Sequence, residues 1–288
     1  MQPPKRDSKP NIPNNPKQFI KGLNESRPRL SVAIVTYNEG HMLEECLESI
    51  KWADEIVIVD LGSTDNTLDV ARRFTDRITF HEHVSYVELV RNFSIEQTTG
   101  EWILILDPDE RVTSSLAEQI KHTLADDIIY EAVKLPRITY YFGRPIHYTG
   151  YGVDYIARLF RRNAVDWKPE VHFRPTFQGQ VLRLQYDSAA NNAILHINYT
   201  SVSQFIDKMN RYTTNEAQKA YAKGRRFRWY KPFYNFTKEF YSRFFLLHGY
   251  RDGIYGFIIS LLFAIYWMVA ALKLWEIEHN LENDTLSQ

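Results

Sequence analysis

Apolar runs of strand length alternate with amphipathic segments of helical spacing over the first part of the chain. Four runs are apolar enough for strands covered on both faces: Leu30–Thr36, Glu55–Val59, Ile78–His81 and Glu101–Leu106. Between them, apolar residues recur with the period of a helix in His41–Trp52, Thr67–Phe74 and Leu89–Thr98. This alternation with short connections predicts an α/β fold, with a Rossmann-like, mostly parallel sheet and helices on both faces.

The pattern is less regular after Ser114. It predicts strands and then a helix at Ala132–Ile138, Tyr155–Phe160, Val181–Leu184 and Ser201–Lys223. In the region 233–250, Phe236, Phe240 and Phe244 recur at the spacing of one helix face, which predicts an aromatic helical stripe.

Residues 254–272 contain no charged side chain. The run just reaches the length of about 20 residues that a transmembrane helix needs, and its aromatic flanks are typical of a bilayer interface. The same pattern is compatible with a helix lying in the interface beside the aromatic segment 233–250, and with a buried or oligomer-forming helix of a soluble protein. Because Lys and Arg residues are dense before this run, the sequence favours membrane attachment, with the basic side cytoplasmic if the helix spans.

The composition narrows the class of partner. The formal net charge is zero, with 35 basic and 35 acidic residues, so no bulk field directs the chain to nucleic acid. The single cysteine, Cys46, excludes an intramolecular disulfide framework and lies on an apolar helical face, which indicates a packed thiol. Residues 1–29 are rich in Pro, Lys and Asn and predict a disordered N-terminal arm rather than a signal peptide.

Carboxylates follow the strand that is predicted to end at Leu106. Asp107, Asp109 and Glu110 come directly after its apolar run. Ligands of open α/β sheets bind at the carboxyl ends of strands, and hard cations such as Mg²⁺ take carboxylate oxygens together with phosphate oxygens. The segment therefore predicts a metal and phosphate site for a nucleotide-activated substrate, and the alternative is a solvated acidic turn.

Several short motifs share one order and spacing over about residues 30–115: Val35–Glu39, Trp52–Asp60, Gly62–Asp65, Arg91–Asn92, Gly100–Trp102 and Asp107–Glu110. Together they resemble the family 2 glycosyltransferases of GT-A fold, in the lipopolysaccharide-core and cell-envelope branch. Weaker similarity continues through Arg158–Arg162, His196 and Asp252–Gly253. The resemblance implies a GT-A catalytic domain over 30–200, with a nucleotide-sugar half at 30–115 and an acceptor half at 116–200. Helices with a membrane-associated region would follow over 201–288.

The resemblance also implies how the acids after the fourth strand would act. Asp109 would be the direct metal ligand. Asp107 would lie nearer the ribose or a metal-bound water, within reach of the same metal, and Glu110 would orient the site.

The remaining matched residues would hold the donor. Glu39 and Asp60 would hold the base and the ribose, and Thr36 and Asn38 would shape the same pocket. Arg91 would neutralise phosphate charge, although an ordinary surface cation fits its sequence context equally well. Ser63 and Asp65, in the turn that follows Asp60, are also compatible with simple helix capping.

An inverting transfer requires a general base that removes the proton of the attacking acceptor hydroxyl. Relatives often have a His followed by a Glu here, whereas this chain has Glu170 before His172. Glu170 is the first candidate for the base and Asp154 the second. His172 is compatible with metal ligation, with pairing to the base, or with a buried structural role, and His196 is expected to be a core or hinge histidine.

The sequence hypothesis is a metal-dependent inverting glycosyltransferase that uses Mg²⁺ or Mn²⁺ and a nucleotide-diphosphate sugar, with a UDP-sugar as the first expectation. Its acceptor would be a cell-envelope glycolipid or lipid-linked saccharide at the cytoplasmic face of the inner membrane. The sequence is also compatible with a homo-oligomer. Two alternatives are a non-catalytic nucleotide-binding scaffold at the membrane and a nucleotidyltransferase. The second would need a Gly-rich basic loop where this chain has Tyr37–Gly40.

Overall fold

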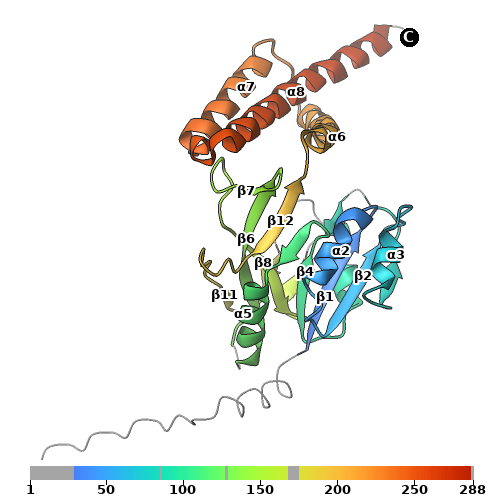
Figure 1. Cartoon of the computed structure of the whole chain (residues 1–288). Helices are drawn as coiled ribbons and strands as arrows, with labels where there is room; N and C mark the ends of the chain where they lie inside the picture. Colours follow the sequence, from blue (N-terminus) through green and yellow to red (C-terminus); the bar gives the residue numbers. More distant parts are fainter. Residues whose placement is uncertain (1–28, 85, 127–128, 168–174, 287–288) are drawn as a thin grey trace, which may run out of the picture.

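A curled sheet with helices on both faces carries three further helices at one end (Figure 1). The computed structural model describes residues 29–84, 86–126, 129–167 and 175–286.

The first part of the sheet is parallel. Its elements are β1 (Leu30–Thr36), α2 (Gly40–Glu48), β2 (Glu55–Asp60), α3 (Thr67–Arg72), β3 (Ile78–Phe80), the 3₁₀ turn η1 (Val87–Leu89), α4 (Arg91–Glu96) and β4 (Trp102–Leu106). β1 lies between β2 and β4, with Thr36 opposite Asp60 and Ile34 opposite Leu106. The alternating pattern therefore predicted this part correctly, and the carboxyl ends of β1, β2 and β4 meet at one edge.

The second part of the sheet is mixed rather than parallel. It contains β5 (Glu110–Val112), α5 (Ser114–Ala125), β6 (Ala132–Tyr141), β7 (Arg144–Pro145), β8 (Asp154–Arg161), β9 (Val165–Asp166), β10 (Thr176–Phe177), β11 (Val181–Arg183) and β12 (Ile194–Tyr199). The strand order is β3-β2-β1-β4-β8-β6-β12-β5, and β8 runs antiparallel to both β4 and β6. The predicted α/β fold with a sheet and covering helices is confirmed, and the second part adds antiparallel strands to the parallel ones. β6 pairs in parallel with β11 and β12, but it returns to β8 through the β7 turn without the crossover helix that a parallel neighbour needs.

The apolar run of β4 is continuous because both faces of the sheet are covered. Successive side chains of a strand point to opposite faces. Leu104 and Leu106 pack in the cluster formed with α2, α3 and α5, whereas Ile103 and Ile105 pack with Ile95 of α4 on the other face.

The C-terminal part comprises α6 (Val202–Ala222), α7 (Lys231–Tyr241), the π-helical turn η2 (Ser242–Leu246), the 3₁₀ turn η3 (Gly249–Asp252) and α8 (Gly253–Leu286). The aromatic segment 233–250 is α-helical only as far as Tyr241, and the chain turns at His248, whose φ of 57° is left-handed. The predicted stripe nevertheless forms, since the ring of Phe240 lies 5.4 Å from that of Phe244 and 5.8 Å from that of Phe257 of α8.

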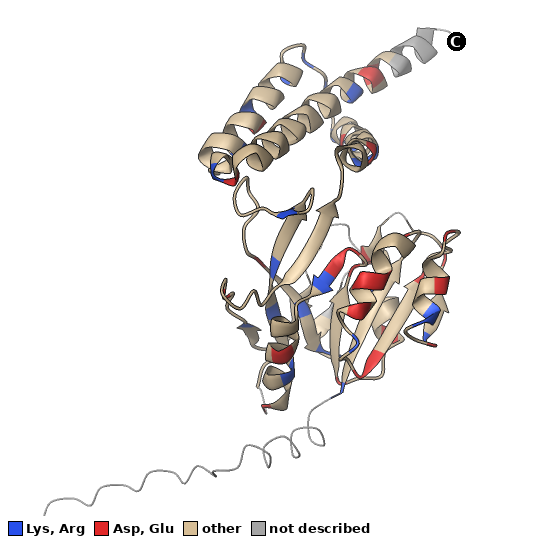
Figure 2. Ribbon diagram, viewed as in Figure 1, with Lys and Arg blue, Asp and Glu red and all other residues tan. Residues whose placement is uncertain are grey.

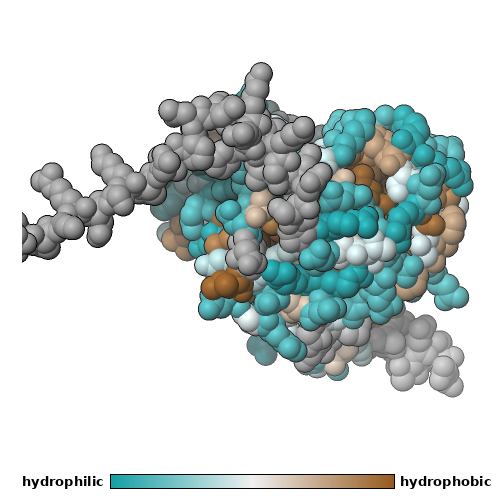
Figure 3. Space-filling view, turned by 90° about the horizontal axis from the view of Figure 1, so that it is seen from below, coloured by the Kyte–Doolittle hydropathy of each residue, from teal (hydrophilic) through white to brown (hydrophobic). Residues whose placement is uncertain are grey.

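α8 contains the uncharged run and extends beyond it. Residues Gly249–His279 are long and apolar enough to cross a membrane, and about a third of the most apolar window is buried inside the protein. Figure 2 shows hardly any charged residue along the first part of α8, in contrast to the sheet below. The face at the opposite end of the molecule is largely hydrophilic, with only scattered apolar patches (Figure 3).

A third apolar cluster joins the helices to the sheet. It combines Tyr141 and Tyr199 at the ends of β6 and β12 with Phe205 of α6 and Ile259 of α8. The C-terminal helices are therefore packed directly on the strands that lead to them.

Gly100, directly before β4, provides a test of the packing between neighbouring strands. A Cβ there would lie 2.6 Å from the Ser31 hydroxyl oxygen and 2.7 Å from the Arg29 carbonyl oxygen. We expect Gly100→Ala to lower the free energy of unfolding by about 1–3 kcal/mol through overpacking, measured by urea denaturation. Gly152→Ala is the control, since its Cβ would meet the His147 carbonyl oxygen at an ordinary 3.5 Å. Equal stability of the two variants would contradict this account.

Candidate functional site

Two buried oxygens without partners mark the carboxyl ends of β1 and β2. Asp60 accepts hydrogen bonds through Oδ2 from the backbone N–H groups of Gly62 and Ser63, at 3.0 and 2.9 Å. Its Oδ1 and the Oγ1 of the facing Thr36 are buried with no hydrogen-bond partner among the described residues. Buried polar atoms are nearly always paired, so this pair of oxygens is positioned for a ligand.

The turn after β2 is held to the turn after β1. Asn38 adopts a left-handed φ of 53°, its Oδ1 accepts from the N–H of Thr64 at 2.7 Å, and its own N–H donates to the Ser63 hydroxyl at 2.9 Å. Asp65 accepts from the N–H groups of Thr67 and Gly40 at 2.9 and 3.2 Å, which joins the starts of α3 and α2. The side chains of Asn38, Ser63 and Asp65 thus shape the backbone of the site.

Asp107 is held by two arginines. Arg158 of β8 donates to Asp107 Oδ2 at 2.6 Å, and Arg91 of α4 donates to Oδ1. Burial alone would raise the pKa of Asp107, but the Arg158 and Arg91 guanidinium groups hold it well below its usual range. Arg91 is buried, not a surface cation, and its Nε and Nη1 have no hydrogen-bond partner in the described part of the chain.

Glu110 and Arg111 fix the segment that carries these acids. The fully buried Glu110 accepts from the Asp107 N–H at 3.1 Å and pairs with Arg137 and Arg158 at 3.2 and 3.4 Å. Arg111 donates to the carbonyl oxygens of Pro108 and Met42 at 2.6 and 2.7 Å. These bonds stabilise the 107–110 turn against α2.

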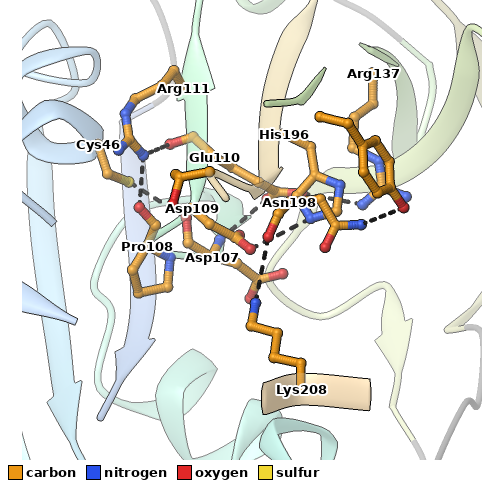
Figure 4. A network of polar contacts seen from close by, with 12 residues as sticks. Cys46, Asp107, Pro108, Asp109, Glu110, Arg111, Arg137, His196, Asn198 and Lys208 are labelled. Carbon is orange, nitrogen blue, oxygen red and sulfur yellow. Dashed lines mark hydrogen bonds and ion pairs between the residues drawn. The ribbon is translucent and has the colours of Figure 1, made fainter. Parts of the chain in front are cut away.

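Asp109 is turned towards β12 and α6 instead. Its Oδ2 lies 3.4 Å from Nε2 of His196, and the His196 Nδ1 is buried without a hydrogen-bond partner among described residues. Lys208 of α6 donates to the Asn198 carbonyl oxygen at 3.4 Å. Figure 4 shows Asp109, His196, Asn198 and Lys208 facing one another beside Asp107.

Negative charge near Asp109 is only partly compensated. Burial and the nearby Asp109 and Asp107 carboxylates raise the pKa of Glu39 from its ordinary 4.5 to about 7, and Lys208 offsets this in part. Carboxylates that raise one another's pKa form a site for an added positive charge. Among the described residues, no group of three or more His, Cys, Asp or Glu side chains could hold a metal ion alone.

A pocket of about 480 Å³ opens on the far side of His196. Its walls include Arg137, Asp154, His196 and Asn198 together with the 150–153 loop. Asp154 lies at the start of β8 with its side chain 57% exposed, and Arg137 holds it at 3.0 Å. This candidate base therefore faces a space that adjoins the Asp109 and His196 pair.

The outer wall of this pocket is held by the C-terminal part. Asp252 accepts from the N–H groups of His147 and Tyr148 at 3.2 and 2.9 Å. Arg243 donates to the Thr149 carbonyl oxygen at 2.8 Å and lies 4.1 Å from the centre of the Phe263 ring.

The structure brings together most of the residues proposed from the sequence. Asp60 and Thr36 meet at one end of the site and Asp107 and Asp109 at the other, whereas Glu170 and His172 lie outside the described residues. Sequence reasoning gave no role to Lys208, and it placed His196 in the core. For Arg158 and His196, the short apolar strands around them were the only local signal.

One family profile matches the chain. It is described as glycosyl transferase family 2, and the match covers residues 31–185. These residues include all the described acids of the site, and His196 and Lys208 follow the match.

Two relatives are similar over most of their length. The lipopolysaccharide core biosynthesis glycosyltransferase LpsC of Rhizobium meliloti (strain 1021) is 29% identical, and the match covers 86% of this chain and 92% of LpsC. The uncharacterized glycosyltransferase RC0292 of Rickettsia conorii is 23% identical, with 86% and 90% covered.

Two solved structures are similar at low sequence identity. S. aureus TarS 1-349 is 16% identical, with 65% of each chain covered and a TM-score of 0.44. Glucosyl-3-phosphoglycerate synthase from Mycobacterium tuberculosis, in complex with Mn²⁺ and UDP-glucose, is 19% identical, with 45% of this chain and 50% of the synthase covered and a TM-score of 0.35.

The raised pKa of Glu39 predicts a pH-dependent stability. Between about pH 4.5 and 7 the folded state binds this proton more tightly than the unfolded state does, so the free energy of unfolding falls as the pH rises through this window. Gln has no such titration, so Glu39→Gln should gain about 1–3 kcal/mol over the wild type between pH 4.5 and pH 8. Urea denaturation at both pH values measures the gap. The exposed Glu48→Gln is the control, and a gap for Glu39→Gln no larger than for this variant would refute the assignment.

Proposed function

The chain belongs to glycosyl transferase family 2 and is a glycosyltransferase, and on this premise we propose that it moves a sugar, with inversion, from a nucleotide-diphosphate donor to a glycolipid or lipid-linked saccharide at a membrane surface. One observation carries the proposal. The unpartnered oxygens of Thr36 and Asp60 and the facing pair of Asp109 and His196 lie at one edge of the sheet. An extended donor would bridge them.

The donor would lie along the carboxyl ends of β1, β2 and β4. Asp60 Oδ1 and Thr36 Oγ1, which have no hydrogen-bond partner in the described ranges, would bind the nucleoside. The buried Arg91 and, from α6, Lys208 would bind the diphosphate. A UDP-sugar is the donor that we propose first.

Asp109 and His196 fit a divalent cation that a diphosphate helps to hold. Mg²⁺ and Mn²⁺ commonly take one or two protein ligands and complete their shells with phosphate oxygens and water, and an imidazole favours Mn²⁺ over Mg²⁺. When bound, such a cation stabilises the negative charge that develops on the leaving diphosphate. Asp107 is a poorer ligand because two arginines already occupy its oxygens, so we assign the metal to Asp109 and His196.

The acceptor would enter the pocket beside His196. Its hydroxyl oxygen attacks the anomeric carbon, and its proton passes to a carboxylate. The bond to the diphosphate breaks with the electron pair leaving on the phosphate oxygen. Asp154, held in place by Arg137, is the described carboxylate best positioned for this proton. Glu170 stays a candidate.

We further propose that α8 lies along a membrane surface instead of crossing it. Asp252, directly before its first turn, holds the 147–148 backbone, and its later part contacts α6 and the following loop. Lys273 donates to Asn210 and Thr214 at 2.7 Å, and Glu278 accepts from the Phe227 N–H at 2.8 Å. A spanning helix would separate these ends by a hydrocarbon core of about 30 Å and draw the charged α6 into it.

The outer surface of the helices suits an interface. Trp229 and Phe233 are 84% and 77% exposed, and aromatic side chains beside basic ones are favoured at the level of lipid headgroups. The likeness to LpsC, a lipopolysaccharide core biosynthesis glycosyltransferase by name, supports a cell-envelope glycolipid as acceptor. The location that we propose is the cytoplasmic face of the inner membrane. A non-catalytic scaffold would bind the nucleotide without turnover, and a nucleotidyltransferase has no support in the family match.

Loss of the metal ligands should abolish turnover while the fold persists. We expect Asp109→Ala and His196→Ala to lower the Mn²⁺-dependent hydrolysis of a UDP-sugar at least about 100-fold, since charge stabilisation by a bound cation contributes several kcal/mol. EDTA should do the same to the wild type. Released UDP is measured, and Asp69→Asn on the exposed side of α3 is the control. If the wild type hydrolyses the UDP-sugar equally fast in EDTA, the proposal that a divalent cation takes part is wrong.

The two candidate bases can be separated by comparing transfer with donor hydrolysis. Asp154→Asn should slow transfer to the acceptor about 100- to 10,000-fold, with little change in the KM for the donor. If Asp154→Asn transfers normally and Glu170→Gln does not, the base is Glu170.

A further inference from the structure

A pocket of about 720 Å³ lies between α6, α7 and α8, away from the carboxylates. Its apolar side is formed by Ala217 and Ala220 of α6 and by Trp267 and Leu274 of α8. Ala217 and Leu274 are buried. The helices therefore enclose a space lined by small and apolar side chains, with room for part of a hydrocarbon chain.

The mouth of this pocket is basic. Arg225, Arg226, Arg228 and Lys231, from the loop between α6 and the start of α7, line it against a single acid, Glu216. Over the part of the chain that the structure describes, none of these four cations forms an ion pair. Arg226 lies 4.6 Å from the centre of the Tyr221 ring and donates to the Arg225 carbonyl oxygen at 3.2 Å.

The start of α7 adds to this positive field. The helix begins at Lys231, has no side-chain cap and carries no acid in its first turn. The dipole of a helix favours an anion at its N-terminus, although here the Lys231 N–H already donates to the Arg228 carbonyl oxygen at 2.8 Å and Pro232 has no N–H. Cations, the positive end of a helix dipole and an apolar chamber thus converge on one opening.

We propose that this pocket binds one anionic phospholipid of the bilayer, with the phosphate on the arginines and an acyl chain between the helices. The inference rests on the membrane association proposed above. Arginine suits a phosphate because its planar fork donates two parallel hydrogen bonds. The exposed Trp229 lies in the same loop, next to Arg228, where a headgroup layer would meet it.

The position of the pocket favours a bilayer lipid over the phosphate of a saccharide acceptor. Lys208, which faces the Asp109 site, and Ala222, next to the basic loop, lie near opposite ends of α6. At 1.5 Å per residue these positions are about 20 Å apart. A lipid in the pocket would therefore anchor the enzyme without occupying the reaction site.

Co-flotation of the full chain with vesicles tests the proposal. The wild type should float with phosphatidylcholine vesicles that contain phosphatidylglycerol far more than with phosphatidylcholine alone, and excess inorganic phosphate should not release it. The triple variant Arg225→Gln, Arg226→Gln, Arg228→Gln should lose about 100-fold in partitioning, which is about 1 kcal/mol for each cation. Its control removes three exposed cations near the other end of the sheet: Arg29→Gln, Lys51→Gln, Arg73→Gln.

A second variant distinguishes lipid binding in the pocket from attraction of the vesicles by diffuse surface charge. Ala220→Trp fills the chamber without altering any charge and should reduce the preference for phosphatidylglycerol, whereas Ala222→Trp, exposed outside the pocket on the same helix, should not. Circular dichroism checks that each variant is folded.

Each of the other outcomes contradicts a specific part of the proposal. Equal flotation with both vesicle types, equal loss in the two triple variants, or no effect of Ala220→Trp overturns the lipid pocket alone. No flotation at all overturns membrane association as well. Donor hydrolysis without vesicles should be unchanged in all these variants, so its loss in Asp109→Ala reports on the transferase proposal separately.

Discussion

The site depends on how the negative charge at the carboxyl edge of the sheet is divided. Asp107 and Glu110 are compensated by the buried Arg91 and the partly buried Arg137 and Arg158, from three different elements, which fixes the turn that follows β4. Asp109 and Glu39 are left with less compensation, and burial together with the nearby Asp109 and Asp107 carboxylates raises the pKa of Glu39 to about 7. A fully neutralised edge would be more stable and would have no use for a cation or a diphosphate. Incomplete neutralisation is therefore the physical basis of the proposed activity.

The parts of the fold that repeat a simple pattern were predictable. β1, β2 and β4 are buried on both faces, and their β-branched and aliphatic runs end at the polar residues that form the site. The antiparallel β8 was predicted as a strand but not as the neighbour of β4, because pairing depends on contacts distant in sequence. The helix α5 was not predicted, although Thr113 marks its start, where the Thr113 hydroxyl accepts a hydrogen bond from the Leu116 N–H.

The candidate site was predictable only where its chemistry is local. Asp107, Asp109 and Asp60 follow apolar strands, and their order matches a known family. His196 and Lys208 come from β12 and α6, and nothing near them in the sequence indicates that they face Asp109. Arg158 was noted only within the segment Arg158–Arg162 of weaker family similarity, which gave it no role. Their roles depend on β12 lying beside β5, so that His196 pairs with Glu110 in the register next to Asp109.

The bonds from Asp252 and Arg243 to the 147–149 backbone make the shape of the pocket beside His196 depend on the C-terminal part of the chain. The loop that closes one side of the acceptor pocket is joined to β6 through the hydroxyl groups of Tyr151 and Tyr141, and its 147–149 backbone is held by the turns that precede α8. A fragment cut after Tyr199 would retain the nucleotide edge but lose the outer boundary of the neighbouring pocket. The sheet and the C-terminal helices are therefore not two independent modules. The segment with Arg243 and Asp252 holds the loop that forms one wall of the pocket beside His196.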